Sequence, residues 1–217
     1  MLAGAVIACA LIATSAHAAA QLDQADIPEA GPIPTASAGY AISDGFAYGQ
    51  TFTAGLTGRL TRVDLAIFGT QYDVTGEGFS ISLEQTPGVT LYSSHFNFTD
   101  VADPYLNDWS QALRMDVTDP SLQVTAGQAY RILLTPDVGA TAPAIGWLIQ
   151  FDNTALTYAG GDGFAQVGGV EYSYPDVDYG FRIYVETAVP EPATWALMLL
   201  GFGGLGCALR GRRSLAA

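Results

Sequence analysis

Apolar residues alternate with polar or small ones in five short segments between residues 40 and 187. The alternating positions are Val63, Leu65 and Ile67; Phe79, Ile81 and Leu83; Leu113, Met115 and Val117; Tyr130, Ile132 and Leu134; and Phe181, Ile183 and Val185. A period of two is typical of a strand with one buried face. Since no helical stripe interrupts the pattern, it predicts an all-β domain.

Clusters of turn-forming residues separate these segments, at positions 86–89, 119–121, 125–128 and 160–163. This spacing suits antiparallel strands joined by tight turns. The segment 145–151 is apolar on both faces, so we expect it to be a central strand. The region 40–187 is therefore expected to form an antiparallel, jelly-roll-like β-sandwich, with roughly eight to ten strands in two packed sheets.

The C-terminal end has the composition of a membrane anchor. Pro190 and Pro192 hold Glu191 in extended, non-helical backbone. Residues 193–209 carry no charge, and the length of this stretch is at the lower limit for crossing a hydrocarbon layer of ~30 Å. A basic end follows, formed by Arg210, Arg212 and Arg213. Because basic residues beside a span stay in the cytoplasm, the preceding domain is expected to lie outside the inner membrane.

This tail resembles the PEP-CTERM sorting signal of Gram-negative bacteria, in the variant with Trp-Ala soon after the second proline. The matching residues are Pro190, Glu191, Pro192, Trp195 and Ala196, followed by the glycine-rich stretch 199–206 and the basic end 210–213. The same tail is also known as the ice-binding protein C-terminal domain. The resemblance implies an exosortase, a membrane-embedded cysteine peptidase, as the enzyme that recognises the tail and cuts near the Pro-Glu-Pro motif.

The middle of the chain is similar to the jelly-roll modules that often precede this tail. The resembling stretches are 49–53, 60–63, 124–130, 158–161 and 178–182. This similarity supports the expected fold and assigns no catalytic residue.

The N-terminal end has the composition of a secretory leader. Residues 2–16 are apolar and small, and Ala16-His17-Ala18 forms an A-x-A site, so we expect a signal peptide cut near Ala18 or Ala20. The Sec translocon and signal peptidase are then expected partners. The resulting organisation is a signal peptide at 1–20, a flexible arm at 21–39, the sandwich at 40–187 and the sorting signal at 188–217.

Removal of both ends limits the chemistry of the mature domain. Cys9 lies in the leader and Cys207 in the anchor, so disulfides and thiolate metal sites are excluded. The chain has no lysine, and His95 is the only histidine outside the leader, which excludes Schiff-base chemistry and histidine-rich zinc sites. All 21 acidic residues lie between residues 23 and 191, whereas three of the eight arginines lie in the tail. Such an acidic domain is a poor partner for nucleic acid.

Acidic loops and one histidine are the candidates for a metal or catalytic site. Asp100, Asp103 and Asp108 could offer oxygen ligands to calcium, and Asp176 with Asp178 form a second candidate. Acidic loops are most often only solvated, so no cofactor is expected and calcium is the alternative. His95 follows Ser93 and Ser94, but neighbouring side chains on a strand face opposite ways, so a catalytic triad is not expected.

Aromatic residues near polar loops are the candidates for ligand binding. Sugar rings stack on exposed aromatic faces, which makes Trp109 the first candidate and the group Tyr172, Tyr174 and Tyr179 the second. Trp147 is expected in the core.

These features predict a non-enzymatic, exported surface or matrix protein that binds polysaccharide. The alternatives are a purely structural role in a matrix or biofilm and, less favoured, a secreted glycan hydrolase. Among 21 acidic residues, some pair will by accident have the carboxyl–carboxyl distance that a glycoside hydrolase needs. The sequence therefore carries no argument for catalysis.

Overall fold

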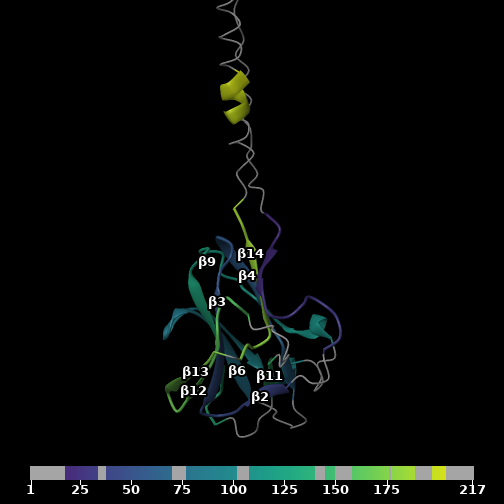
Figure 1. Cartoon of the computed structure of the whole chain (residues 1–217), viewed down its shortest axis with the longest axis vertical. Helices are drawn as coiled ribbons and strands as arrows, with labels where there is room; N and C mark the ends of the chain where they lie inside the picture. The colour runs from purple at the N-terminus through teal and green to yellow at the C-terminus, as the bar shows by residue number, and fades with distance from the viewer. Residues whose placement is uncertain are drawn as a thin grey trace, which may run out of the picture. The chain divides into compact units, whose positions relative to one another are not determined.

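The computed structural model describes residues 18–33, 38–69, 77–101, 108–139, 145–149, 158–175, 177–188 and 197–203. The chain divides into two compact units, one of residues Ala20–Thr187 and the other of Met1–Ala19 and Ala188–Ala217. In the larger unit the described residues form fourteen strands, and all their pairings are antiparallel (Figure 1). The domain is therefore all-β, as the alternation of apolar residues predicts.

The strands belong to three sheets. The six-stranded sheet has the order β13 (Val170–Tyr174), β12 (Gly163–Val167), β3 (Phe46–Thr53), β10 (Ala129–Pro136), β6 (Gly78–Thr86) and β7 (Val89–Asn97). The five-stranded sheet has the order β1 (Gln21–Ala25), β14 (Phe181–Glu186), β4 (Gly58–Leu65) and β8 (Leu113–Asp116), and β9 (Gln123–Val124) also pairs with β4. The three-stranded sheet has the order β2 (Ala38–Ile42), β11 (Ile145–Ile149) and β5 (Ile67–Gly69). The described residues of this unit also form two 3-10 helices, η1 (Phe98–Asp100) and η2 (Trp109–Gln111).

One apolar core joins residues from all three sheets. Its members include Ile81 and Ile132 of the six-stranded sheet, Val63 and Ile183 of the five-stranded sheet, and Trp147 of β11. The alternating residues named above therefore face inward, as predicted. Trp147 is fully buried and its indole Nε1 donates to the carbonyl of Gly180 at 3.0 Å, which confirms its expected place in the core.

The segment expected to be a flexible arm is ordered where the structure describes it. Residues Gln21–Ala25 form β1, which pairs with β14, and Ile27 is buried in a second cluster with Ala66, Trp109 and Leu148. That part of the prediction was wrong because proline and glycine content reports only local backbone preference. Long-range pairing and burial of Ile27 decide the conformation of these residues.

The number of strands and sheets also differs from the sequence prediction. Fourteen strands in three sheets occur among the described residues, where eight to ten in two sheets were expected. The additional strands include β2, β5 and β9, which have between two and five residues. Alternation cannot be recognised over so few positions.

The smaller unit is described only at residues 18–19, 188 and 197–203. Residues 197–203 are helical and lie within the predicted span 193–209. No helix in the described part of the chain is long and apolar enough to cross a membrane. Residues 1–17, which contain most of the predicted leader, lie outside the described residues.

Both ends of the larger unit lie on adjacent strands. Gln21 at the start of β1 is opposite Val185 near the end of β14. β14 is an inner strand, with β1 on one side and β4 on the other. The chain therefore enters and leaves this unit at the same end of one strand pair.

Candidate functional site

Four tyrosines come together where the three-stranded sheet meets the end of the six-stranded sheet. Tyr40 is in β2, Tyr48 in β3, Tyr174 ends β13, and Tyr179 precedes β14. We call these four residues the tyrosine cluster. Small residues opposite them leave space for the rings: Ala165 of β12 faces Tyr48, and Gly163 of the same strand faces Tyr174.

The rings of the tyrosine cluster are stacked. Tyr40 lies nearly parallel to Tyr48, with ring centroids 5.5 Å apart, and nearly parallel to Tyr174, with centroids 6.4 Å apart. Tyr179 is tilted against Tyr48 at 5.9 Å and against Trp147 at 4.8 Å. Offset-stacked and tilted pairs at these distances are the favourable aromatic geometries. The cluster therefore presents a preformed aromatic surface supported by the core.

The burial of the cluster decreases from the core outward. Tyr179 is fully buried, Tyr48 nearly so, Tyr174 is half-buried, and Tyr40 is 39% exposed. Among the described residues, no hydrogen-bond partner is found for the buried hydroxyl of Tyr179, and the hydroxyls of Tyr40, Tyr48 and Tyr174 have none either. Burial, followed by the nearness of the other tyrosines, raises the pKa of Tyr48 and of Tyr179. The phenols of Tyr48 and Tyr179 therefore stay neutral, and a neutral phenol can both donate and accept hydrogen bonds.

Exposed apolar side chains border the cluster on the same sheet face. Tyr172 and Tyr48 both lie opposite Ala165, and Phe46 and Val170 both lie opposite Val167. Tyr172 is 49% exposed, Phe46 is 42% exposed and Val170 is 54% exposed. The aromatic surface thus extends from Tyr40 toward the edge strand β13.

The sequence found this site only in part. Of the predicted group, Tyr174 belongs to the cluster and Tyr172 borders it, whereas Tyr179 is fully buried beneath it. Tyr40 and Tyr48 were missed. They come from strands far from β13 in sequence, and only the pairing of β3 with β12 and the contact of β2 with β3 bring them near.

Trp109 was the first candidate for a sugar platform, and the structure overturns this prediction. Its side chain is 3% exposed and packs in the cluster with Ile27, Ala66 and Leu148. Its backbone N–H donates to the carbonyl of Gly31 at 2.9 Å. Residues 27–33 thus cover the tryptophan, which local sequence around Trp109 cannot reveal.

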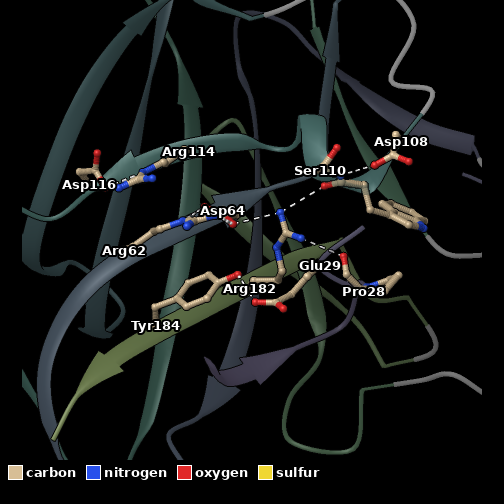
Figure 2. A network of polar contacts seen from close by, with 11 residues as sticks. Pro28, Glu29, Arg62, Asp64, Asp108, Ser110, Arg114, Asp116, Arg182 and Tyr184 are labelled. Atoms are coloured by element: carbon tan, nitrogen blue, oxygen red, sulfur yellow. Dashed lines mark hydrogen bonds and ion pairs between the residues drawn. The ribbon is translucent and has the colours of Figure 1, made fainter. Parts of the chain in front are cut away.

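A buried polar network around Arg182 helps to hold Pro28 and Glu29 in place (Figure 2). Arg182 of β14 contacts the carboxylate of Asp64 at 3.0 Å, and both side chains are buried. Arg182 also donates to the carbonyls of Pro28 at 2.9 Å and Trp109 at 3.1 Å. One guanidinium therefore joins β4, η2 and the N-terminal segment, which is a structural role.

Arg62 and Tyr184 extend this network toward solvent. The Arg62 Nε donates to Asp64 Oδ1 at 2.6 Å, and its guanidinium lies 4.4 Å from the ring centroid of Tyr184. The Tyr184 hydroxyl donates to Glu29 at 3.2 Å. Asp64 is thus shared between two arginines, which compensates its burial.

The predicted calcium residues have other roles where the structure describes them. Asp108 accepts hydrogen bonds from the backbone N–H groups of Ser110 and Gly31, and the bonds from Ser110 hold its pKa below the usual value. Asp100 accepts from the backbone and side chain of Asn97. Asp103 lies outside the described residues. Within the described ranges, no group of three or more His, Cys, Asp or Glu residues is placed to hold a metal ion.

The second acidic candidate is also engaged. Asp178 is buried, accepting from Gln50 Nε2 at 2.8 Å and from the backbone N–H of Tyr158 at 2.7 Å. Asp176 lies outside the described residues. Close to Asp178, burial raises the pKa of Asp26 to about 7, with repulsion from Asp178 as the second cause. One oxygen of Asp26 is buried without a hydrogen-bond partner among the described residues.

His95 is paired with a carboxylate on the six-stranded sheet. Its Nε2 lies 3.1 Å from Asp137 Oδ2, and both side chains are largely exposed. Ser93 bonds instead to Ser82 at 3.0 Å, and Ser94 lies on the opposite face from His95. No serine hydroxyl among the described residues is hydrogen-bonded to His95.

Comparison with known proteins identifies the C-terminal tail. A family model described as the PEP-CTERM protein-sorting motif matches residues 188–213. No curated protein matches the chain. The matched range contains the predicted motif residues Pro190, Glu191, Pro192, Trp195 and Ala196 and the basic residues Arg210, Arg212 and Arg213, all of which lie outside the described residues.

This motif implies export, targeting to an exosortase, and a destination at the cell surface or outside the cell. The resemblance seen in the sequence is thereby confirmed. The chain carries a PEP-CTERM protein-sorting motif at residues 188–213, on the C-terminal side of an all-β unit.

Proposed function

We propose that this protein is cut by an exosortase after export and that its jelly-roll-like sandwich binds polysaccharide through the tyrosine cluster. The tyrosine cluster is the single observation that carries the proposal. Stacked rings supply a flat surface for the apolar face of a sugar ring. Phenol hydroxyls without a hydrogen-bond partner among the described residues lie beside them and would supply the donors and acceptors that sugar hydroxyls require.

Charge supports a neutral polysaccharide as the ligand. The whole chain has a formal net charge of −13, and none of its basic residues is a lysine. An anionic polymer would be repelled by such a domain unless a cation bridged the two. We therefore propose neutral glycans as the first ligand class and calcium-bridged acidic glycans as the second.

Residues 20–187 are suited to the test because all three sheets and all three apolar clusters lie within them. This segment should bind members of a glycan panel, screened with and without calcium. Tyr40→Ala removes the most exposed ring of the tyrosine cluster, so we expect about tenfold weaker binding. Tyr40→Phe keeps the ring and should cost less.

Tyr92→Phe is the matched control. The Tyr92 hydroxyl is bonded to the carbonyl of Asp116 and to Thr118, away from the cluster, so this variant should bind like the wild type. Melting temperatures of all variants separate lost binding from lost folding. A flat response across the panel, with or without calcium, would support the purely structural matrix role instead.

One observation favours the hydrolase alternative. A glycosidase needs a carboxyl that stays protonated near neutral pH, and burial gives Asp26 a pKa of about 7. We nevertheless propose a non-enzymatic role, because the neighbouring Asp178 is fixed by Gln50 and Tyr158 rather than free to act. Release of reducing sugar from any bound glycan, abolished by Asp26→Asn, would reverse this choice.

For the tail, we propose a temporary anchor in the inner membrane. Residues 193–209 would span the bilayer, with the basic end 210–213 in the cytoplasm and the sandwich outside. The described helical residues 197–203 support this, since their large apolar side chains are all exposed: Leu197, Met198, Leu199, Leu200 and Phe202. The Sec translocon and signal peptidase would act at the other end of the chain, before the exosortase.

A further inference from the structure

The edge strand β13 (Val170–Tyr174) has little protection against pairing. It pairs only with β12 among the described strands, and four of its five residues are exposed. Its residues Val170, Tyr172 and Tyr174 are strong strand formers. An exposed, regular edge with such side chains is a template for another strand.

Other edges carry features that discourage pairing. β1 has a bulge at Leu22/Gln24, and β7 has two register shifts against β6. β8 exposes the charged residues Arg114 and Asp116. β2 is uncharged, but it carries Gly39 and two alanines, which are poor strand formers. β13 has no bulge in its register with β12.

The single charge on β13 is already compensated within the chain. Glu171 Oε2 accepts from Arg131 at 2.6 Å and from Gln166 at 3.3 Å. Lysine, proline and inward-pointing charge are the usual protections of an edge, and residues 170–174 contain none of them. An approaching strand would therefore meet no unpaired charge on β13.

The backbone of β13 determines which residues could pair with another strand. β12 and β13 are joined by the two-residue turn Gly168–Gly169, with φ of 58° and 81°. Such a turn makes Val167 and Val170 a hydrogen-bonded pair, so by alternation Tyr172 and Tyr174 also bond to β12. The N–H and C=O groups of Glu171 and Ser173 then point away from the sheet.

We propose that β13 pairs antiparallel with β13 of a second copy of this chain, with Tyr172 opposite Tyr172 at the two-fold axis. In this register Glu171 of each copy lies opposite Ser173 of the other. Their outward backbone groups then form all four hydrogen bonds that the two edges can offer. The two six-stranded sheets become one continuous sheet.

Neighbouring registers are less favourable. Moving the axis to Glu171 places like charges opposite each other, which destabilises an antiparallel pair. Moving it to Ser173 places Glu171 opposite Pro175, which has no N–H to donate. The strand is thus complementary to itself in one register, which favours a second copy over an unrelated peptide as the partner. The pairing does not depend on polysaccharide binding.

Charge at position 173 provides the first test, with residues 20–187 examined by sedimentation velocity over a range of concentrations. Ser173→Lys places a cation opposite Glu171 of the other copy and should tighten the dimer. Ser173→Glu places a second carboxylate there and should weaken it. We expect shifts of roughly threefold to tenfold in opposite directions, smaller at high salt.

A cysteine at the two-fold axis provides the second test, because residues 20–187 contain no other cysteine. Tyr172→Cys would place two thiols in a non-hydrogen-bonded pair, where Cα atoms are about 4.5 Å apart and can be bridged. Mild oxidation should give a covalent dimer. Val89→Cys, exposed on the opposite edge strand β7, is the control and should react much more slowly.

Several outcomes would overturn the proposal. They are equal cross-linking at positions 172 and 89, shifts in the same direction for Ser173→Lys and Ser173→Glu, and a monomer at all concentrations for every variant. Circular dichroism of each variant confirms that the sandwich is intact. Glycan binding is measured separately, so failure of one proposal leaves the other standing.

Discussion

Arg182 and Asp64 form an ion pair at 3.0 Å between β14 and the neighbouring β4, and both side chains are shielded from solvent. Since Arg182 also bonds the carbonyls of Pro28 and Trp109, its loss removes the donor to both carbonyls and leaves the buried Asp64 with Arg62 as its remaining ion-pair partner. We expect Arg182→Met to lower the free energy of unfolding by about 3–5 kcal/mol, measured by urea denaturation of residues 20–187.

The surface pair Arg114 and Asp116 is the matched control for this prediction. It joins the same residue types at 2.7 Å, but both side chains are more than half exposed. Arg114→Met should therefore change the free energy of unfolding by less than about 1 kcal/mol. Equal costs for the two substitutions would contradict a special role for the buried pair.

A side chain at position 49 is expected to destabilise the domain because the ring of Phe164 lies against the backbone of Gly49. A Cβ on Gly49 would stand 2.0 Å from Cζ of Phe164, and the Arg131 guanidinium lies over the same ring, 4.1 Å from its centroid. Gly49→Ala should lower the free energy of unfolding by about 1–3 kcal/mol. In a Phe164→Ala background the same substitution should cost little, and a double-mutant cycle measures the difference.

Stability should fall as pH rises toward neutrality because of Asp26. Its pKa is raised from 3.8 to about 7 in the folded protein. At a pH between these two values, the folded state therefore holds a proton that the unfolded state has lost. The stabilisation is fully present below about pH 4 and is lost as pH rises through about 7. Burial raises the pKa of Asp178 too, which acts in the same direction.

Asp26→Asn should flatten this dependence, since an amide does not titrate. Relative to the wild type, the free energy of unfolding of the variant should rise by roughly 1–3 kcal/mol between pH 4 and pH 8. Urea denaturation at each pH measures this difference. Parallel curves for the two proteins would show that Asp26 does not titrate in this range.

Processing should depend on the two prolines of the sorting motif. Replacing both Pro190 and Pro192 with alanine in the native host should leave the tail attached, which is visible as a larger protein retained in the membrane fraction. Thr194→Ala lies within the matched range but outside the motif residues, so it should be processed normally. An unchanged size and destination of the double variant would contradict the sorting assignment.

Six of the fourteen described strands were predictable because their apolar residues follow a recognisable pattern. β4, β6, β8, β10 and β14 all coincide with alternating segments, and β11 coincides with the segment that is apolar on both faces. β11 lies between β2 and β5, in agreement with its expected central place. The pattern of apolar residues that predicts burial on one or both faces lies within a single segment, so it can be recognised in the sequence.

The site was less predictable because its parts meet only through long-range pairing. Trp109 seemed accessible in a polar loop until residues 27–33 covered it, and Tyr40 reaches Tyr174 from more than a hundred residues away. Arg182 and Asp64 give no sequence signal either. Their strands are adjacent in the sheet, whereas they are distant in the chain.

The position of β14 between β1 and β4 would have a mechanical consequence under the membrane anchoring proposed above. A pull transmitted through the tail runs along β14, whose ladder bonds to both neighbours lie perpendicular to that direction. The bonds on both sides are therefore loaded together in shear rather than opened one after another. This resists extraction of the strand while the domain is tethered or under flow.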